Sequence, residues 1–134
     1  MKNLLGILLF CVPVLGLAVD TTGDRDLPPA DKTAGVDLHD PEVINKGMAM
    51  LSSTCGGYCH GTEGRGFKGP SLRNRTDLDA DSLHATITFG RKRAGKLMPP
   101  WGGVLSEAEI WTAIAAIVSL RHVEPDKGAK PAAH

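Results

Sequence analysis

The chain has 134 residues, which is enough for one small domain. Its formal net charge of zero argues against a general nucleic-acid-binding protein. Only 4% of the residues are aromatic, which excludes a large aromatic-rich core. Because a small domain buries little surface of its own, a bound apolar group would add to its stability.

The first eighteen residues have the parts of a secretory signal peptide. Lys2 supplies the positive charge, residues 4–14 form a short apolar run that contains Cys11, and Gly16-Leu17-Ala18 follow it. We predict cleavage after residue 18, which makes 1–18 the signal peptide and the mature protein periplasmic. The alternative is an uncleaved membrane anchor, although the apolar run is shorter than the roughly 20 residues that a span needs.

Residues 19–40 are rich in Asp and Pro and have no apolar periodicity, which is typical of a flexible leader. Order is expected to begin at Asp40-Pro41, where an N-cap residue precedes a proline suited to the first helical position. Apolar residues then recur at helical spacing and predict an amphipathic helix of about three turns. Gly47 in its middle indicates that another element approaches closely.

The middle of the chain is predicted to hold two loops and one helix. Residues 55–75 contain six glycines, which let a backbone wrap closely around a flat object. A short helix is expected next, with Asp79 or Asp81 as its cap and Gly90 at its end. Residues 95–103 are predicted to form the second loop. No strand of convincing length is recognisable.

The last predicted helix has the clearest signals. Ser106 and Glu109 fit a capping box, and three isoleucines follow on one stripe. Residues 123–134, rich in Pro, Lys and Ala, are expected to be a disordered tail. The sequence thus predicts an all-α domain over residues 41–122 with three main helices.

The most informative motif runs from Cys55 to His60 and puts a histidine directly after the second of two close cysteines. Two thiols and an imidazole on one turn can hold a haem, because thiols add across its vinyl groups and imidazole binds iron. The usual attachment motif has two residues between the cysteines, and here there are three. A disulfide that closes a tiny loop is an alternative for an exported protein. Zinc is disfavoured, because no second cysteine pair or close histidine pair follows.

Four further elements accompany this motif: Gly69-Pro70-Ser71-Leu72, Met98-Pro99-Pro100-Trp101, Leu105-Ser106-Glu107 and Ser119-Leu120-Arg121. Together, in this order, they resemble class I c-type cytochromes over residues 41–121. The resemblance implies the small cytochrome c fold, in which three main helices wrap around one covalently bound haem c. It also implies an electron carrier rather than an enzyme.

The resemblance assigns the haem attachment to the cysteine motif. Cys55 and Cys59 would form the two thioethers, and His60 would be the proximal iron ligand. The third residue between the cysteines is expected to loop out at Gly56-Gly57, because glycine reaches backbone angles that other residues avoid.

The resemblance also assigns the remaining contacts of the haem. Pro70 would present its carbonyl to the outer nitrogen of His60, which orients an iron-binding imidazole. Met98 would be the distal iron ligand, and His/Met ligation suits electron transfer. Trp101 is expected to pack against the haem edge, and Trp111 at the crossing of the two terminal helices.

Basic residues predominate between His60 and Pro100, where eight of them stand against four acidic ones. The basic residues are Arg65, Lys68, Arg73, Arg75, Arg91, Lys92, Arg93 and Lys96. A basic rim around a haem would attract a redox partner with an acidic docking surface. The alternative is that these residues neutralise the haem propionates or are merely solvated.

We therefore predict a monomeric, exported, single-haem cytochrome that carries one electron between redox partners. A periplasmic quinoprotein dehydrogenase is a fitting donor, and neither nucleic acid nor, after signal cleavage, a membrane span is expected. One alternative is a haem subunit of a stable oxidoreductase complex. Another is a haem sensor or ligand-binding protein in which Met98 leaves the iron.

Overall fold

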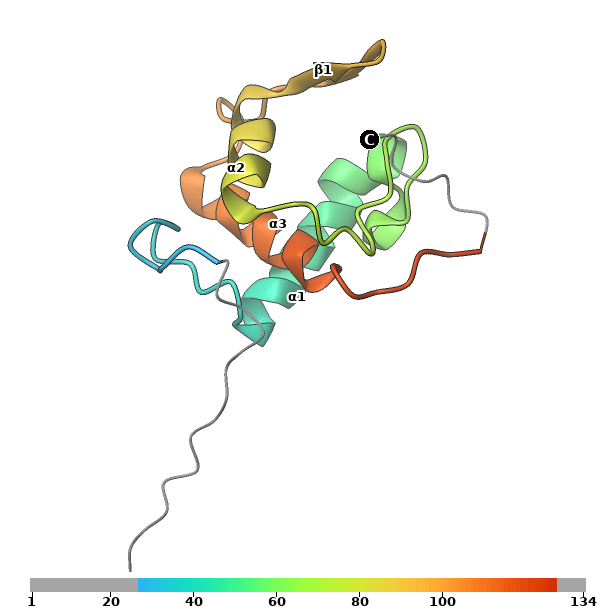
Figure 1. The fold of residues 1–134 in the computed structure, drawn as a ribbon. Helices are drawn as coiled ribbons and strands as arrows, with labels where there is room; N and C mark the ends of the chain where they lie inside the picture. The colour runs from blue at the N-terminus through green and yellow to red at the C-terminus, as the bar shows by residue number, and fades with distance from the viewer. Residues whose placement is uncertain (1–26, 128–134) are drawn as a thin grey trace, which may run out of the picture.

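A computed structural model of the chain describes residues 27–127 (Figure 1). The predicted signal peptide and residues 128–134 lie outside the described residues. The elements in order are the helices and turns α1 (Pro41–Met50), η1 (Leu51–His60), η2 (Thr62–Gly64) and α2 (Ala80–Phe89), the strands β1 (Arg91–Arg93) and β2 (Lys96–Met98), and the helix α3 (Glu107–Ser119). The three predicted helices are confirmed, and the prediction of an all-α fold is corrected by a small two-stranded sheet.

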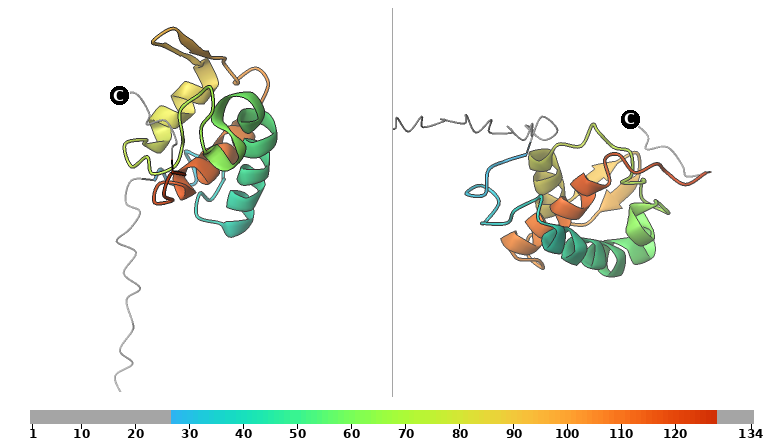
Figure 2. Two further views of the ribbon diagram at one scale, coloured as in Figure 1. Left: turned by 90° about the vertical axis from the view of Figure 1, so that its right-hand side faces the viewer. Right: turned by 90° about the horizontal axis from the view of Figure 1, so that it is seen from below.

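Helices α1 and α3 cross each other at Gly47 (Figures 1 and 2). Helix α1 starts where predicted, since the Asp40 carboxylate accepts a hydrogen bond from the Glu42 amide at 2.8 Å. A Cβ atom on Gly47 would lie 2.2 Å from the carbonyl oxygen of Thr112 and 2.9 Å from the Cβ of Ala116. The close approach predicted at Gly47 is therefore confirmed, and it brings two backbones into contact.

Helix α3 forms the centre of the core. Its predicted capping box is present, with Glu109 Oε2 accepting from the Ser106 amide at 2.8 Å. Every residue from Ile110 to Val118 is buried, and the core adds Leu51, Leu72, Leu83, Ile87 and Leu120 from the segments around it.

Trp111 does not lie at the helix crossing as predicted. Its indole stacks on the ring of His84 in α2, with 4.6 Å between the ring centroids. Its Nε1 donates a hydrogen bond to Glu107 Oε1 at 2.9 Å. The reason is steric. The two helices are so close at Gly47 that only small side chains, those of Thr112 and Ala116, fit between them. The large indole of Trp111 therefore packs against α2.

Asp79 is the N-cap residue of helix α2, and Gly90 follows its last residue, both as predicted. Strands β1 and β2 follow as an antiparallel hairpin, so part of the predicted loop over residues 95–103 is a strand. The hairpin turn has positive φ at Ala94 (48°) and Gly95 (75°), as a type I′ turn requires. In Figure 1 the hairpin projects beyond α2, away from α1 and α3.

Part of the predicted leader packs against the domain. Thr33 is fully buried, and its Oγ1 donates a hydrogen bond to the carbonyl oxygen of Val36. Leu38 is 4% exposed and belongs to the core. Residues 27–40 are therefore part of the folded body rather than a flexible segment. Within residues 27–127, no helix is both long and apolar enough to cross a membrane.

Candidate functional site

The cysteine–histidine motif lies on a π-helical segment that continues α1 without a break. Segment η1 covers Leu51–His60, so the predicted loop begins only after His60. In a π-helix each amide bonds to the carbonyl five residues earlier, which makes its turn wider than an α-helical turn. The amide of Gly61 accordingly donates to Gly56 O at 2.9 Å. The wider turn of the π-helix accommodates the third residue between the cysteines. The predicted local bulge at Gly56-Gly57 is wrong, because the helix runs through both glycines.

The two glycines between the cysteines have different surroundings. A Cβ on Gly56 would lie 2.8 Å from Gly61 O and 3.0 Å from Leu51 O, so this buried position requires glycine. A Cβ on Gly57 would meet no atom within 4 Å. Only the first glycine is therefore needed by the winding of η1.

Cys55 and Cys59 are free, half-buried thiols. Burial raises the pKa of the Cys55 thiol, and the nearby sulfur of Cys59 raises it further. The Cys55 thiol consequently stays protonated at neutral pH.

The imidazole of His60 is held by a backbone carbonyl. His60 Nδ1 lies 3.0 Å from Pro70 O, the contact that the resemblance implied. Burial lowers the pKa of His60, and the hydrogen bond to Pro70 acts in the opposite direction with less effect. A neutral imidazole that donates through Nδ1 keeps its Nε2 lone pair for a metal.

Gly69 gives the Pro70 loop its close approach to the imidazole, a role that the sequence analysis did not find. A Cβ on Gly69 would lie 3.1 Å from Cε1 of His60. Its amide donates to Cys59 O at 2.8 Å, which ties the loop to the end of η1. A glycine directly before the proline of a carbonyl contact is the only sequence signal that could have indicated this role.

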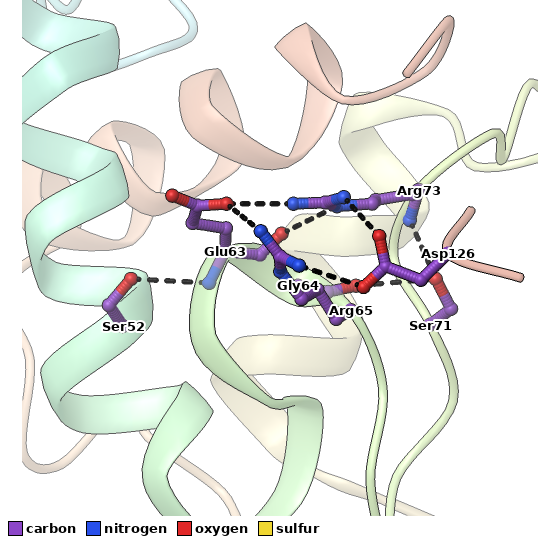
Figure 3. A network of polar contacts seen from close by, with 7 residues as sticks. All are labelled: Ser52, Glu63, Gly64, Arg65, Ser71, Arg73 and Asp126. Atoms are coloured by element: carbon purple, nitrogen blue, oxygen red, sulfur yellow. Dashed lines mark hydrogen bonds and ion pairs between the residues drawn. The ribbon is translucent and has the colours of Figure 1, made fainter. Parts of the chain in front are cut away.

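A cluster of ion pairs joins the residues that follow Pro70 to Glu63 and to Asp126 (Figure 3). The side chain of Arg73 is 8% exposed and lies 2.9 Å from Glu63 Oε2 and 3.3 Å from Asp126 Oδ1. Arg65 contacts the same two carboxylates, each at 2.9 Å. Asp126 lies in the segment predicted to be a disordered tail, and through it residues 123–127 are joined to the loop. The charges of the two arginines are thus paired with carboxylates of the same chain.

Met98 is the last residue of strand β2. It is half-buried and packs against the core, as do Cys55 and Trp101. The chain after it returns to α2, where the Trp101 amide donates to Ile87 O at 2.9 Å. A Cβ on Gly90, which has a φ of +74°, would lie 2.6 Å from Met98 O. The end of α2 therefore positions the methionine.

The residues present fit a haem. Two free thiols, a neutral imidazole and a thioether form the donor set of a covalently attached haem with His/Met ligation. Large apolar side chains are exposed on η1, on the loop before Pro70 and at the end of α2, with Tyr58 66%, Phe67 68% and Phe89 77% accessible. A large apolar group would cover such surface, which small proteins rarely leave exposed.

Comparisons with known proteins give the family. The family described as "Cytochrome C oxidase, cbb3-type, subunit III" matches residues 42–115. Among solved structures, cytochrome CL from the marine methylotrophic bacterium Methylophaga aminisulfidivorans is similar, with 27% identity and a TM-score of 0.52. The match covers 61% of this chain and 57% of that one, so the chain spans little more than half of its length.

A c-type cytochrome NirC is also similar, with 28% identity over 60% of this chain and 93% of that one and a TM-score of 0.46. No curated protein matches the chain. The family match covers more than half of the chain. The chain therefore belongs to this family of c-type cytochromes, and its cofactor is covalently attached haem c with iron.

Proposed function

We propose that the protein carries one electron at a time between larger redox proteins in the periplasm. Cys55 and Cys59 would hold the haem through two thioethers, and His60 and Met98 would be the ligands of its iron. The strongest support is the hydrogen bond between His60 Nδ1 and Pro70 O at 3.0 Å, since it orients the imidazole and leaves Nε2 for the metal. The bound haem supplies a reversible one-electron couple.

The residues of the chain have separate tasks in this proposal. Pro70 keeps the imidazole in one tautomer, and Gly69 brings the carbonyl close enough to do so. Met98 contributes a thioether, which favours reduced iron and raises the potential. Trp101, which is half-buried and packs against the core, would cover the haem edge. His60 and Met98 together would leave the iron without a free position for a substrate.

Export and partners belong to the same proposal. The N-terminal signal predicts a periplasmic monomer, and the basic residues predict a partner with an acidic docking surface. A quinoprotein dehydrogenase as donor stays a prediction from the resemblance.

The test is mass spectrometry and absorption spectroscopy of protein matured with an export-linked haem attachment system. We expect one haem per chain, two thioethers, loss of residues 1–18, and slow or no binding of carbon monoxide to the reduced protein. Rapid binding of carbon monoxide would contradict the six-coordinate carrier and favour the sensor alternative. Absence of covalent haem would contradict the proposal entirely.

A second candidate is a haem subunit of a stable oxidoreductase complex, and the description of the matching family favours it. The two candidates differ in solution size. A carrier elutes as a monomer when extracted from the native host, whereas a subunit elutes with a catalytic chain. A stoichiometric catalytic partner that resists high salt would favour the subunit.

A further inference from the structure

The eight basic residues between His60 and Pro100 fall into two groups in the structure. Those of the loop after His60 are already engaged within the protein. Arg65 and Arg73 pair with Glu63 and Asp126, and Arg75 pairs with Asp77 at 2.6 Å.

Lys68, the fourth basic residue of that loop, is also engaged. Its Nζ lies over the ring of Tyr58, 3.7 Å from the centroid. The three arginines of this loop are therefore paired with carboxylates, and Lys68 lies against an aromatic ring.

The second group occupies the β1–β2 hairpin. Arg91, Lys92 and Arg93 form β1, and Lys96 begins β2. All residues from 91 to 97 are exposed, and none of them is acidic. Within residues 27–127, none of the four basic side chains makes an ion pair, which leaves their charge available.

The register of the hairpin concentrates this charge on one face. Arg93 pairs directly with Lys96, and Arg91 with Met98. Side chains two residues apart on a strand, and partners across a pair, share a face. Three cations thus share the face of Met98, the proposed iron ligand. Like charges directly opposite each other, such as Arg93 and Lys96, destabilise a hairpin. The stability of the hairpin therefore does not explain why these cations are placed together.

The other face carries Lys92 opposite Leu97, which is 71% exposed. An exposed apolar side chain among cations resembles the mixed composition of a protein–protein contact surface. The hairpin also stands out from the helices, as Figure 1 shows. A partner can therefore reach it without meeting the rest of the chain.

We propose that the hairpin over residues 91–98 is the docking element for an acidic patch on a redox partner protein. The inference rests on the proposed electron transfer, since docking there puts the partner beside Met98. The formal net charge of the chain is zero. Attraction must then come from this local patch, which acts over about one Debye length, roughly 10 Å at 0.1 M salt.

The probe is a gold electrode coated with a carboxylate-terminated alkanethiol monolayer, and a hydroxyl-terminated monolayer is the reference. The test variant of the holoprotein combines Arg93→Glu and Lys96→Glu. The matched control combines Lys32→Glu and Lys46→Glu, which change the net charge equally at exposed positions outside the hairpin. Adsorption and the electron-transfer rate are measured by voltammetry at low and high salt.

We expect the hairpin variant to lose about tenfold or more of its adsorption and rate on carboxylate at low salt. The control should lose less than about twofold. Equal losses in both variants, or none, would overturn the proposal. So would a changed midpoint potential with unchanged adsorption, because the cations would then act on the haem propionates. A holoprotein without a reversible wave on either surface would instead contradict the proposed function itself.

Discussion

The segment around His60 and the hairpin that carries Met98 are built in different ways. The first is tied by backbone hydrogen bonds from Gly61 and Gly69 and by ion pairs that include a buried arginine. The second consists of two three-residue strands, and its residues 91–97 are all exposed. The imidazole side is therefore organised by the chain itself, whereas the methionine side depends on a few contacts at the end of α2. We expect substitutions in the segment around His60 to prevent haem binding. Substitutions that affect Met98 should instead change the properties of a haem that stays bound.

The largest effect is expected for His60→Ala. Loss of a hydrogen-bond partner of a metal-binding histidine typically lowers metal affinity or activity roughly 10–100-fold. Removing the imidazole itself should lower the yield of holoprotein by more than this factor. Haem staining of denaturing gels and absorption spectra measure the yield. Pro70→Ala is the control, because alanine keeps the backbone carbonyl that accepts from His60. A normal haem content in His60→Ala would exclude His60 as the ligand.

The next effect is that of Met98→Ala, which should leave the haem attached. Loss of the thioether should lower the midpoint potential by an order of 0.1 V, within the roughly 0.8 V that axial ligands span. It should also open the iron to carbon monoxide. The control is Met48→Ala, which removes another half-buried methionine that packs against the core. An unchanged spectrum and potential would remove Met98 from the iron.

On the attachment side, Gly56→Ala tests the π-helical winding. Its Cβ would lie 2.8 Å from Gly61 O, and overpacking of this kind costs about 1–3 kcal/mol. We expect fewer chains with two thioethers, counted by mass spectrometry of haem peptides. Gly57→Ala has open space and should mature normally. Equal behaviour of the two variants would argue against the winding as the device that presents both sulfurs.

On the methionine side, Gly90→Ala should disturb the position of Met98. The new Cβ would lie 2.6 Å from Met98 O, and the φ of +74° adds strain, so we expect a stability loss of about 1–3 kcal/mol. Gly95→Ala is the control, since its φ is +75° but its surroundings are open. The midpoint potential should fall only in Gly90→Ala. If the midpoint potential fell in both variants, backbone strain alone would explain the fall.

The smallest effect is expected on acidification. Hydrogen bonding to the Arg65 guanidinium holds the pKa of Glu63 below its ordinary value of 4.5. Glu63 therefore binds a proton more readily in the unfolded chain than in the folded one. The stability that the ionised carboxylate contributes is fully present above pH 4.5, and it is lost as the pH falls through the lower pKa of the folded chain. Protection factors of the amides of residues 61–75, which are corrected for the pH dependence of intrinsic exchange, should fall on acidification, while those of the hairpin, which has no carboxylates, should not change. Glu63→Gln should abolish the dependence, and its persistence would exclude Glu63 as the source.

The helix ends were predictable because their signals are local. Asp79 and Ser106 cap helices through amides within three residues, and Gly90 ends α2 with a positive φ. The contact between His60 and Pro70 followed from the resemblance rather than from any local signal. The hairpin was missed because a stretch dominated by arginine and lysine has no alternation of apolar and polar residues.

By itself, the sequence determined which chemical groups are available and where each helix begins, since both depend on residues that are close together along the chain. Tertiary structure decided how those groups are used. It wound the cysteines into a π-helix, turned Trp111 towards α2, and paired Arg73 with an aspartate 53 residues away. Such pairings depend on which distant segments meet, so the separation of the basic residues into engaged and available groups could be found only in the folded chain.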